Sequence, residues 1–309
     1  MNALRRQAAA FQDALLVWYR RHARRLPWRE APTLYRTVVS EFMLQQTQVD
    51  RVVPIFERFV ARWPSFAALA AASQADVIRA WKGLGYNSRA MRLHGLARVV
   101  SERNGGALPG DEVTLRDLPG VGPYTAAAIA AFAFDADTVA VDTNIARIAH
   151  RVRLGLEWPP KATARELHGL ARELLPPGSG HAFNSALMDL GATLCTARAP
   201  KCLLCPVRSA CAAAPIDAAE LAARAREHAR PGSPQARLRF QETTRYVRGR
   251  VVDRLRELPA GQRISLLDLH AELAPVLGHH DAAAFAAIVA ALARERIVDD
   301  RDGRVGLAG

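Results

Sequence analysis

The sequence lacks any run of apolar residues long enough to cross a membrane, although 50% of its 309 residues are hydrophobic. A membrane span needs about 18 consecutive apolar residues. The N-terminal residues also lack the apolar core and cleavage signal of a secretory leader. We therefore expect a cytoplasmic protein with no membrane partner, and the length predicts two or three domains.

Acidic side chains are the scarcer charged type. The chain has 30 Asp and Glu against 42 Lys and Arg, which leaves a formal charge of +12. Such an excess suits a polyanionic partner, and nucleic acid is the favoured one. Arg-rich coding in a high-GC genome would explain part of the same excess, so charge alone does not identify the partner.

Cysteine is also scarce and occurs only within one stretch of seventeen residues, at Cys195, Cys202, Cys205 and Cys211. A disulfide framework would spread cysteines to join distant segments, so a shared metal is the better interpretation. Four thiolates in one compact loop suit a [4Fe-4S] cluster. A structural zinc site usually pairs two short Cys-x-x-Cys motifs across a longer gap, and zinc is the alternative.

Alternating strand patterns are absent from residues 1 to about 215, where apolar residues recur at helical spacing. Residues 218–240 are rich in Arg and Pro and read as a linker. Three helices are expected beyond it, over Tyr246–Leu258, Leu266–Leu273 and Ala282–Glu295, followed by a short hairpin around Asp302-Gly303. This order is typical of a winged helix, and a generic small helical domain is the alternative.

A glycine-rich turn joins two helical stretches at residues 118–125 (Leu-Pro-Gly-Val-Gly-Pro-Tyr-Thr). Gly120 and Gly122 allow positive φ and a close approach of the backbone to a ligand. Amides at the N-terminus of the following helix can hold a phosphate. An ordinary helix connection is the alternative to a phosphate-binding turn.

Two acidic residues stand beside apolar segments. Asp142 follows Val139-Ala140-Val141 at the start of a helical segment, where it suits a helix N-cap as well as a catalytic carboxylate. Glu41 lies in the stretch Ser40–Val49, which is otherwise apolar and amide-rich. A glutamate there either reaches solvent or has a function and a perturbed pKa.

Together these motifs resemble the endonuclease III-like helix-hairpin-helix DNA glycosylases and, most closely, the MutY adenine glycosylases. The resemblance covers about residues 10–215 and includes Leu26-Pro27-Trp28-Arg29, Gly83-Leu84-Gly85-Tyr86 and Met188-Asp189-Leu190-Gly191-Ala192. It implies an all-α, two-lobed helix-hairpin-helix glycosylase fold with an iron–sulfur cluster loop, followed here by a small winged-helix-like domain.

The expected domains follow from this fold. A glycosylase region over 1–217 comprises a six-helix hairpin domain at about 30–147 and a cluster domain from about 1–29 plus 148–217. The 218–240 linker then leads to the winged-helix-like domain at 241–309.

The resemblance also implies roles for individual residues. Glu41 matches the general acid that protonates the departing base, and Asp142 matches the carboxylate that stabilises the cationic sugar, in a cleft between the two lobes. Tyr124 and Asn144 match their hydrogen-bonding supports. Related bifunctional lyases place a lysine at the position of Tyr124, so the resemblance implies a monofunctional glycosylase that forms no Schiff base.

The implied partner is double-stranded DNA that contains a mismatch or a damaged base, bound by a monomer. The residues expected to contact it are Gln45, Gln46, Gln48, Tyr86, Asn87, Gly120, Gly122, Thr125, Arg198 and Lys201. Arginines along the first helix of the tail, from Arg245 to Arg256, suit phosphates or a solvated surface equally well.

Two departures from the family bear on the substrate. Asn87 stands where relatives have a second tyrosine in Gly-Tyr-Tyr, and the tail lacks the length and strands of the usual mixed α/β lesion-reading domain. Adenine opposite 8-oxoguanine or guanine is favoured as the excised base. Thymine or uracil opposite guanine, and hypoxanthine, are the alternatives, and a non-catalytic iron–sulfur DNA-binding protein is the alternative of another class.

Overall fold

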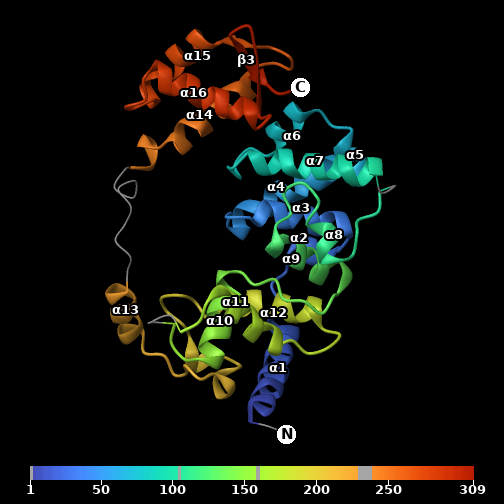
Figure 1. Ribbon diagram of the computed structural model, residues 1–309, viewed down its shortest axis with the longest axis vertical. Helices are drawn as coiled ribbons and strands as arrows, with labels where there is room; N and C mark the ends of the chain where they lie inside the picture. The colour runs from blue at the N-terminus through green and yellow to red at the C-terminus, as the bar shows by residue number, and fades with distance from the viewer. Residues whose placement is uncertain (1–2, 104–105, 158–160, 229–238) are drawn as a thin grey trace. The chain divides into compact units, whose positions relative to one another are not determined.

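The computed structural model describes residues 3–103, 106–157, 161–228 and 239–309, and the chain there is mostly helical (Figure 1). The first helices are α1 (Ala3–His22), α2 (Pro27–Glu30), α3 (Leu34–Leu44), α4 (Val49–Arg62), α5 (Phe66–Ala70), α6 (Gln74–Ala80), α7 (Ser88–Arg103) and α8 (Glu112–Leu115). After them come α9 (Pro123–Phe134), α10 (Thr143–Arg153), α11 (Ala164–Glu173), α12 (Gly180–Thr193) and α13 (Ala218–Glu227). No helix among the described residues is long and apolar enough to span a membrane.

The chain forms two compact units, which we describe separately. Unit 1 comprises residues 1–37, 109–117 and 121–230, and unit 2 comprises residues 38–108, 118–120 and 231–309. Each unit therefore combines segments that are distant in the sequence. The domain boundaries given by the family resemblance stay a prediction.

The core of unit 1 forms where α1, α10 and α12 pack together. Phe11 of α1 meets Phe183 of α12 edge to face, with ring centroids 6.4 Å apart, and Ile148 of α10 is buried beside them. Val207 and Ala210 of the cysteine loop join the same cluster. The loop that carries the cysteines is thus packed on the main core of its unit.

The part of unit 2 that precedes residue 109 is built on α3, α4, α6 and α7. Phe59 of α4 lies between two tryptophans, 4.9 Å from the Trp63 ring and 6.0 Å from the Trp81 ring by centroid. Trp81 is fully buried at the end of α6, and its indole N–H donates to the carbonyl of Gly85. This bond fixes the loop between α6 and α7, where Tyr86 lies.

The C-terminal part of unit 2 has the winged-helix order that the sequence predicted. Its elements are α14 (Thr244–Glu257), β1 (Ile264–Ser265), α15 (Leu266–Leu273), α16 (Ala282–Arg294), β2 (Val298–Arg301) and β3 (Arg304–Leu307). The three short strands form one antiparallel sheet in the order β1-β3-β2. The three predicted helices and the hairpin are confirmed, and β1 is an additional element.

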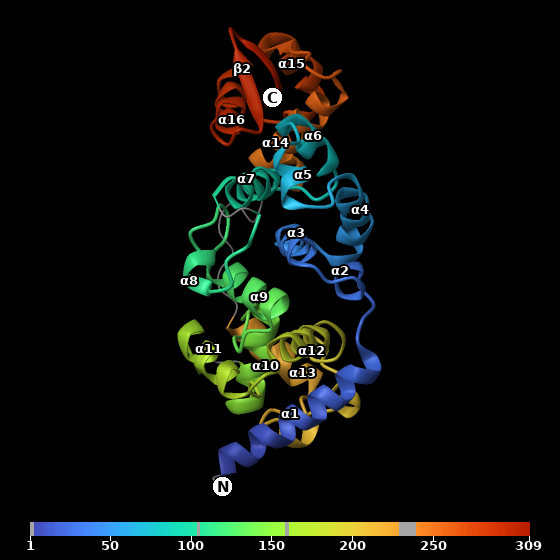
Figure 2. The same ribbon diagram turned by 90° about the vertical axis from the view of Figure 1, so that its right-hand side faces the viewer.

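This domain shares its core with α6. Ile78 of α6 is fully buried in a cluster that otherwise consists of tail residues, among them Val247, Leu269 and Phe285. Arg256 of α14 also donates two hydrogen bonds to the Ile78 carbonyl. Both views of the ribbon show α6 beside this domain (Figure 2).

The predicted linker at 218–240 is helical in its first part, since α13 begins at Ala218 behind an Asp217 N-cap. Residues 229–238 of the linker lie outside the described residues.

Candidate active site

Asp142 is both a helix cap and an oriented carboxylate. Its Oδ1 accepts hydrogen bonds from the backbone amides of Asn144 (2.9 Å) and Ile145 (2.7 Å), which caps α10. Its Oδ2 accepts a hydrogen bond from the side-chain amide of Asn144 at 2.9 Å. The two interpretations left open by the sequence are therefore compatible, because capping uses one oxygen and leaves the other for a further role.

A chain of hydrogen bonds leads from this carboxylate to the cysteine loop. Arg147 donates to the side-chain oxygen of Asn144 at 2.8 Å and to the carbonyl of Cys195 at 2.7 and 2.9 Å. Gly191 lies at the same place, and a Cβ there would come within 2.8 Å of Asn144 Cβ. Asn144 is thus held from two sides in the orientation that supports Asp142.

Glu41 lies on α3 in unit 2, with 6% of its surface exposed. The two residues that follow it in the helix, Phe42 and Met43, are fully buried. Glu41 and Asp142 belong to different units, so the cleft that was expected to contain both stays a prediction.

Arg89, which the sequence analysis missed, organises the segment after Glu41. Its guanidinium donates to the carbonyls of Phe42, Met43 and Gln45 at the end of α3, and to Leu84 and Gly85 before α7. Its partners lie 4 to 47 residues away in sequence. An arginine within the apolar face of α7 was the available signal, since a buried arginine needs partners.

Five of the residues predicted to touch DNA lie on the two segments that Arg89 connects, namely Gln45, Gln46, Gln48, Tyr86 and Asn87. Gln46 and Gln48 are exposed, Gln45 is partly buried, and Gln46 has a positive φ of 55°. Tyr86 is 38% exposed and also has a positive φ, of 45°. Bulky residues in this backbone region are uncommon and mark a segment that its surroundings hold in place.

Asn87 has a structural partner that a tyrosine could not replace in the same way. Its side-chain oxygen accepts a hydrogen bond from Arg256 of α14 at 2.8 Å. Arg256 also pairs with Asp253 and is nearly buried. The departure from the Gly-Tyr-Tyr pattern thus accompanies the packing of the tail on this loop.

The hairpin turn requires glycine at Gly120. Its φ is +78°, and a Cβ there would lie 2.7 Å from Arg92 Cβ and 2.9 Å from Phe42 Cε1. Gly122 instead caps α9 with a φ of −90° and open space around it, and Pro123 follows at the first helical position. The free space at Gly122 leaves the first amides of α9 accessible.

Tyr124 and Thr125 form the first turn of α9. Tyr124 is half-buried against a small apolar cluster that includes Ala128, Ala140 and Met188. Thr125 is 5% exposed, so its side chain faces the interior of unit 1 rather than solvent. A contact of Thr125 with DNA would therefore involve its backbone.

The four cysteines line one small cavity in unit 1, together with Arg151 and Val207. All four are free thiols and partly buried. Among the described residues, no three His, Cys, Asp or Glu side chains converge closely enough for a single metal ion. All four sulfurs border one cavity, which is the arrangement that a cluster ligated by four thiolates requires.

The surroundings of Cys205 and Cys211 disfavour free thiolates. Burial raises the pKa of Cys205 to about 11 and also raises the pKa of Cys211. Arg151 lies 3.5 Å from the Cys195 sulfur, and its guanidinium is fixed by Glu157 and the Thr196 carbonyl. A positively charged group bound by the thiolates would offset the cost of their ionisation.

Arg198 and Lys201 lie in the loop between the first two cysteines, and both are exposed. Neither has an ion-pair partner within the part of the chain that the structure describes. Exposed, uncompensated cations of this kind are suited to a phosphate backbone.

Comparison with known proteins agrees with this geometry. The model of the HhH-GPD superfamily of base excision DNA repair proteins matches residues 39–177. The adenine DNA glycosylase of Mycolicibacterium smegmatis is 44% identical over 246 residues, which span 79% of each chain. The human adenine DNA glycosylase is 44% identical over 217 residues, 67% of this chain and 40% of the human protein.

The chain belongs to the adenine DNA glycosylase family of the HhH-GPD superfamily. This confirms the resemblance that the motifs carried, and it places the glycosylase in base excision repair of DNA.

Solved structures show the same helical fold. A thermostable thymine-DNA glycosylase matches with a TM-score of 0.62 and 30% identity, over 68% of the glycosylase and 97% of that chain. An endonuclease III in a non-covalent complex with DNA matches with a TM-score of 0.58 and 19% identity, over 68% and 96%. The predicted all-α helix-hairpin-helix fold is thus confirmed.

Proposed function

We propose that the glycosylase hydrolyses the N-glycosidic bond of adenine paired with 8-oxoguanine or guanine in double-stranded DNA. Its relatives at 42–44% identity over two thirds or more of the chain are adenine DNA glycosylases. The structural observation that carries the proposal is the carboxylate of Asp142, oriented by three hydrogen bonds. Two of these bonds cap α10, whereas the third, from the Asn144 side chain to Oδ2, is the one that a DNA-binding module would not require.

The residue types suit the chemistry of base excision. Cleavage leaves an anionic base and an oxocarbenium-like sugar. Glu41, which is buried on α3, supplies the proton to the departing base. Asp142 stabilises the cationic sugar through its Oδ2, and Asn144 keeps that oxygen in place. Water then completes the hydrolysis.

Removal of either carboxylate tests these roles. Asp142→Asn keeps the helix cap, because Asn caps about as well as Asp, but removes the charge. Asp217→Asn at the N-cap of α13 is the matched control. We expect Asp142→Asn and Glu41→Gln to slow adenine excision about 10²–10⁴-fold in single-turnover assays, while the control retains its rate.

A panel of duplexes identifies the base. It contains adenine opposite 8-oxoguanine, adenine opposite guanine, thymine or uracil opposite guanine, and hypoxanthine opposite thymine, each followed by alkaline cleavage of abasic sites. Excision of thymine or uracil but not adenine would contradict the proposal and place the chain closer to the thymine-DNA glycosylase it resembles in fold.

Tyr124 supports a monofunctional enzyme, because a phenol cannot form a Schiff base with the sugar. Borohydride treatment during the reaction should therefore trap no covalent adduct with DNA. A strong adduct would show that another amine serves as nucleophile.

We further propose that Cys195, Cys202, Cys205 and Cys211 hold a [4Fe-4S] cluster, on the support of their shared cavity and free thiols. About four irons and four sulfides per chain, with visible absorption lost in Cys205→Ser, are expected. One zinc per chain in place of iron would contradict the assignment.

The protein is also expected to be a monomer in solution. Size-exclusion chromatography with light scattering measures its mass and checks this prediction.

A further inference from the structure

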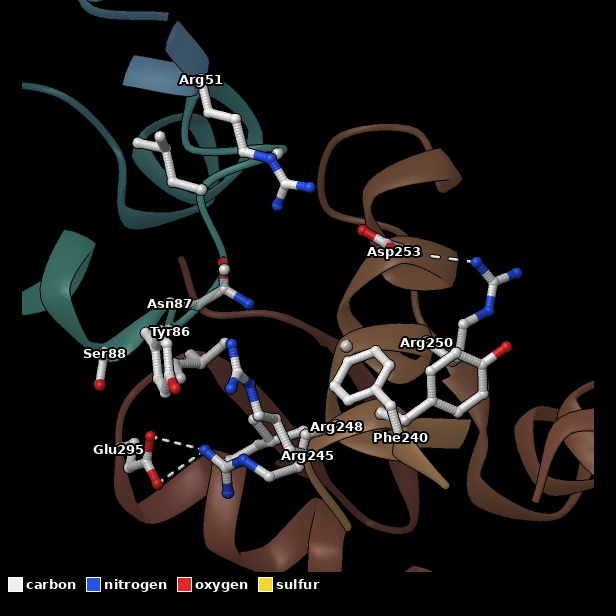
Figure 3. A pocket seen from close by; sticks show the side chains of 17 residues that line it. Arg51, Tyr86, Asn87, Ser88, Phe240, Arg245, Arg248, Arg250, Asp253 and Glu295 are labelled. Carbon is white, nitrogen blue, oxygen red and sulfur yellow. Dashed lines mark hydrogen bonds and ion pairs between the residues drawn. The ribbon is translucent and has the colours of Figure 1, made fainter. Parts of the chain in front are cut away.

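A cavity of about 550 Å³ lies within unit 2, between the α6–α7 loop and the C-terminal domain (Figure 3). One side is formed by residues 83–88, which include Tyr86 and Asn87. The other side is formed by Phe240 and by α14 from Arg245 to Asp253, and Arg51 of α4 also lines it. A volume of this size fits a nucleotide-sized ligand.

The cavity contains more positive charge than its own acids neutralise. Arg248 pairs with Glu295 at 2.7 Å, and Arg250 lies 3.9 Å from Asp253. Arg51 and Arg245 also line the cavity, and neither has an ion-pair partner among the residues described in the structure. Two guanidinium groups therefore remain available to an anion.

Arg245 is held in a fixed orientation without using its hydrogen-bond donors. Its guanidinium carbon lies 4.0 Å from the centroid of the Tyr86 ring and 5.7 Å from that of Phe240. Figure 3 shows it flanked by these two side chains. A guanidinium stacked on an aromatic face keeps its in-plane N–H groups free, and these match the oxygens of a phosphate.

Arg89 increases the positive potential beside the cavity. Its guanidinium also lies over the Tyr86 ring, at 5.6 Å. Burial and, to a smaller extent, the charge of Arg245 lower the pKa of Arg89 to about 10, so Arg89 stays charged at neutral pH. Repulsion between these two cations would be relieved by an anion in the cavity.

We propose that this cavity binds one nucleotide of the DNA on which the glycosylase acts, with one of its flanking phosphates on Arg51, the other on Arg245, and its base against the exposed surface of Phe240. The combination of cationic groups with aromatic faces is the one that binds unstacked nucleotides. The C-terminal domain thereby becomes part of the DNA-binding surface. The inference rests on the family's action on DNA and not on which base is excised.

The test measures binding of the full-length protein to a short undamaged duplex, so that no excision takes part. The variants are Arg51→Ala, Arg245→Ala and the double variant. Arg254→Ala is the control, because Arg254 lies on the same helix but is paired with Glu272 outside the cavity. Melting temperatures confirm that all variants fold.

Each phosphate contact contributes about 0.9 to the slope of log affinity against log salt concentration. We expect each single variant to reduce this slope by about one unit, and the double variant to weaken binding roughly tenfold or more near 0.1 M salt. Arg245→Lys should retain the slope but weaken binding, since lysine keeps the charge and loses the stacking. The control should match the wild type.

Two outcomes would overturn the proposal. One is an unchanged slope and affinity in the double variant. The other is binding of 2′-deoxyadenosine monophosphate as tight as that of the duplex and equally dependent on Arg245, which would make the cavity a site for a free nucleotide. A change in the slope without any adenine excision would leave this inference intact and remove only the proposed substrate.

Discussion

At the scale of single residues, Asn144 separates the two roles of Asp142. The backbone amides of residues 144 and 145 serve the helix cap, whereas only the Asn144 side chain holds the second carboxylate oxygen. Removing that side chain therefore disturbs the orientation of the carboxylate and leaves the cap in place.

Asn144→Ala is expected to lower the single-turnover excision rate about 10²-fold, the usual effect of losing one oriented donor. Its melting temperature should change little, because the capping bonds come from the backbone. Thr143→Ala, at an exposed neighbouring position, is the matched control. A rate equal to wild type would show that Asp142 needs no support from this amide.

Gly120 and Gly122 differ in what a methyl group would meet. Gly120→Ala places Cβ against Arg92 and Phe42 at a positive φ, so we expect a loss of about 2–4 kcal/mol in the free energy of unfolding from strain and overpacking. Gly122→Ala meets open space and should leave stability nearly unchanged. Urea denaturation distinguishes the two, and equal losses would contradict this account of the turn.

At the scale of elements, a buried ion-pair cluster joins the first loop of unit 1 to α12. Asp189 of α12 is fully buried and accepts charge-assisted hydrogen bonds from Arg24 at 2.7 Å and Arg29 at 2.9 Å. It also accepts from the backbone amide of Arg24. The motifs Leu26–Arg29 and Met188–Ala192, which the sequence linked only by resemblance, thus meet in one structural contact.

Asp189→Ala should destabilise the protein by about 3–5 kcal/mol, because it leaves buried guanidinium groups unpaired. Glu102→Ala is the control, since it breaks an exposed pair with Arg98 on α7 and should cost under about 0.5 kcal/mol. Urea denaturation at neutral pH measures both. A similar loss in the free energy of unfolding for the two variants would contradict this prediction. It would mean that water solvates Arg24 and Arg29 well enough to take the place of Asp189.

Local sequence patterns predicted the helices of the C-terminal domain well, but they did not predict how its strands pair. Helix α15 agrees with the predicted Leu266–Leu273, and α14 and α16 agree to within two residues at each end. Strand β1 has only two residues and is defined by pairing with β3, Ile264 opposite Val305, so nothing local could reveal it. Arg89 and Asp189 were missed as organising residues for the same reason, because their partners are far away in sequence.

At the scale of the whole molecule, the C-terminal domain is part of the fold of unit 2 and not an appended module. Ile78 completes its core, and Arg79 and Arg256 add hydrogen bonds across the same contact. Deleting residues 241–309 would therefore expose apolar surface on α6, and the effect on DNA binding would be mixed with an effect on folding. Point variants are the cleaner probe.

Ile78→Ala should destabilise both sides of this contact by about 2–5 kcal/mol. In hydrogen exchange, amides of α6 and of α14 should then lose protection together. Val113→Ala, at a side chain 76% exposed, is the control and should leave the exchange unchanged. Loss of protection in α14 alone would indicate that the domain opens independently of α6.

The shared core around Ile78 also sets an order of events during synthesis. The residues that bury Ile78 extend to Val305, more than two hundred positions later in the chain. At translation rates of roughly 5–20 residues per second, α6 waits on the order of tens of seconds with an uncovered apolar face. Newly made chains are thus open to chaperones, and to wrong partners, until the last strand has left the ribosome.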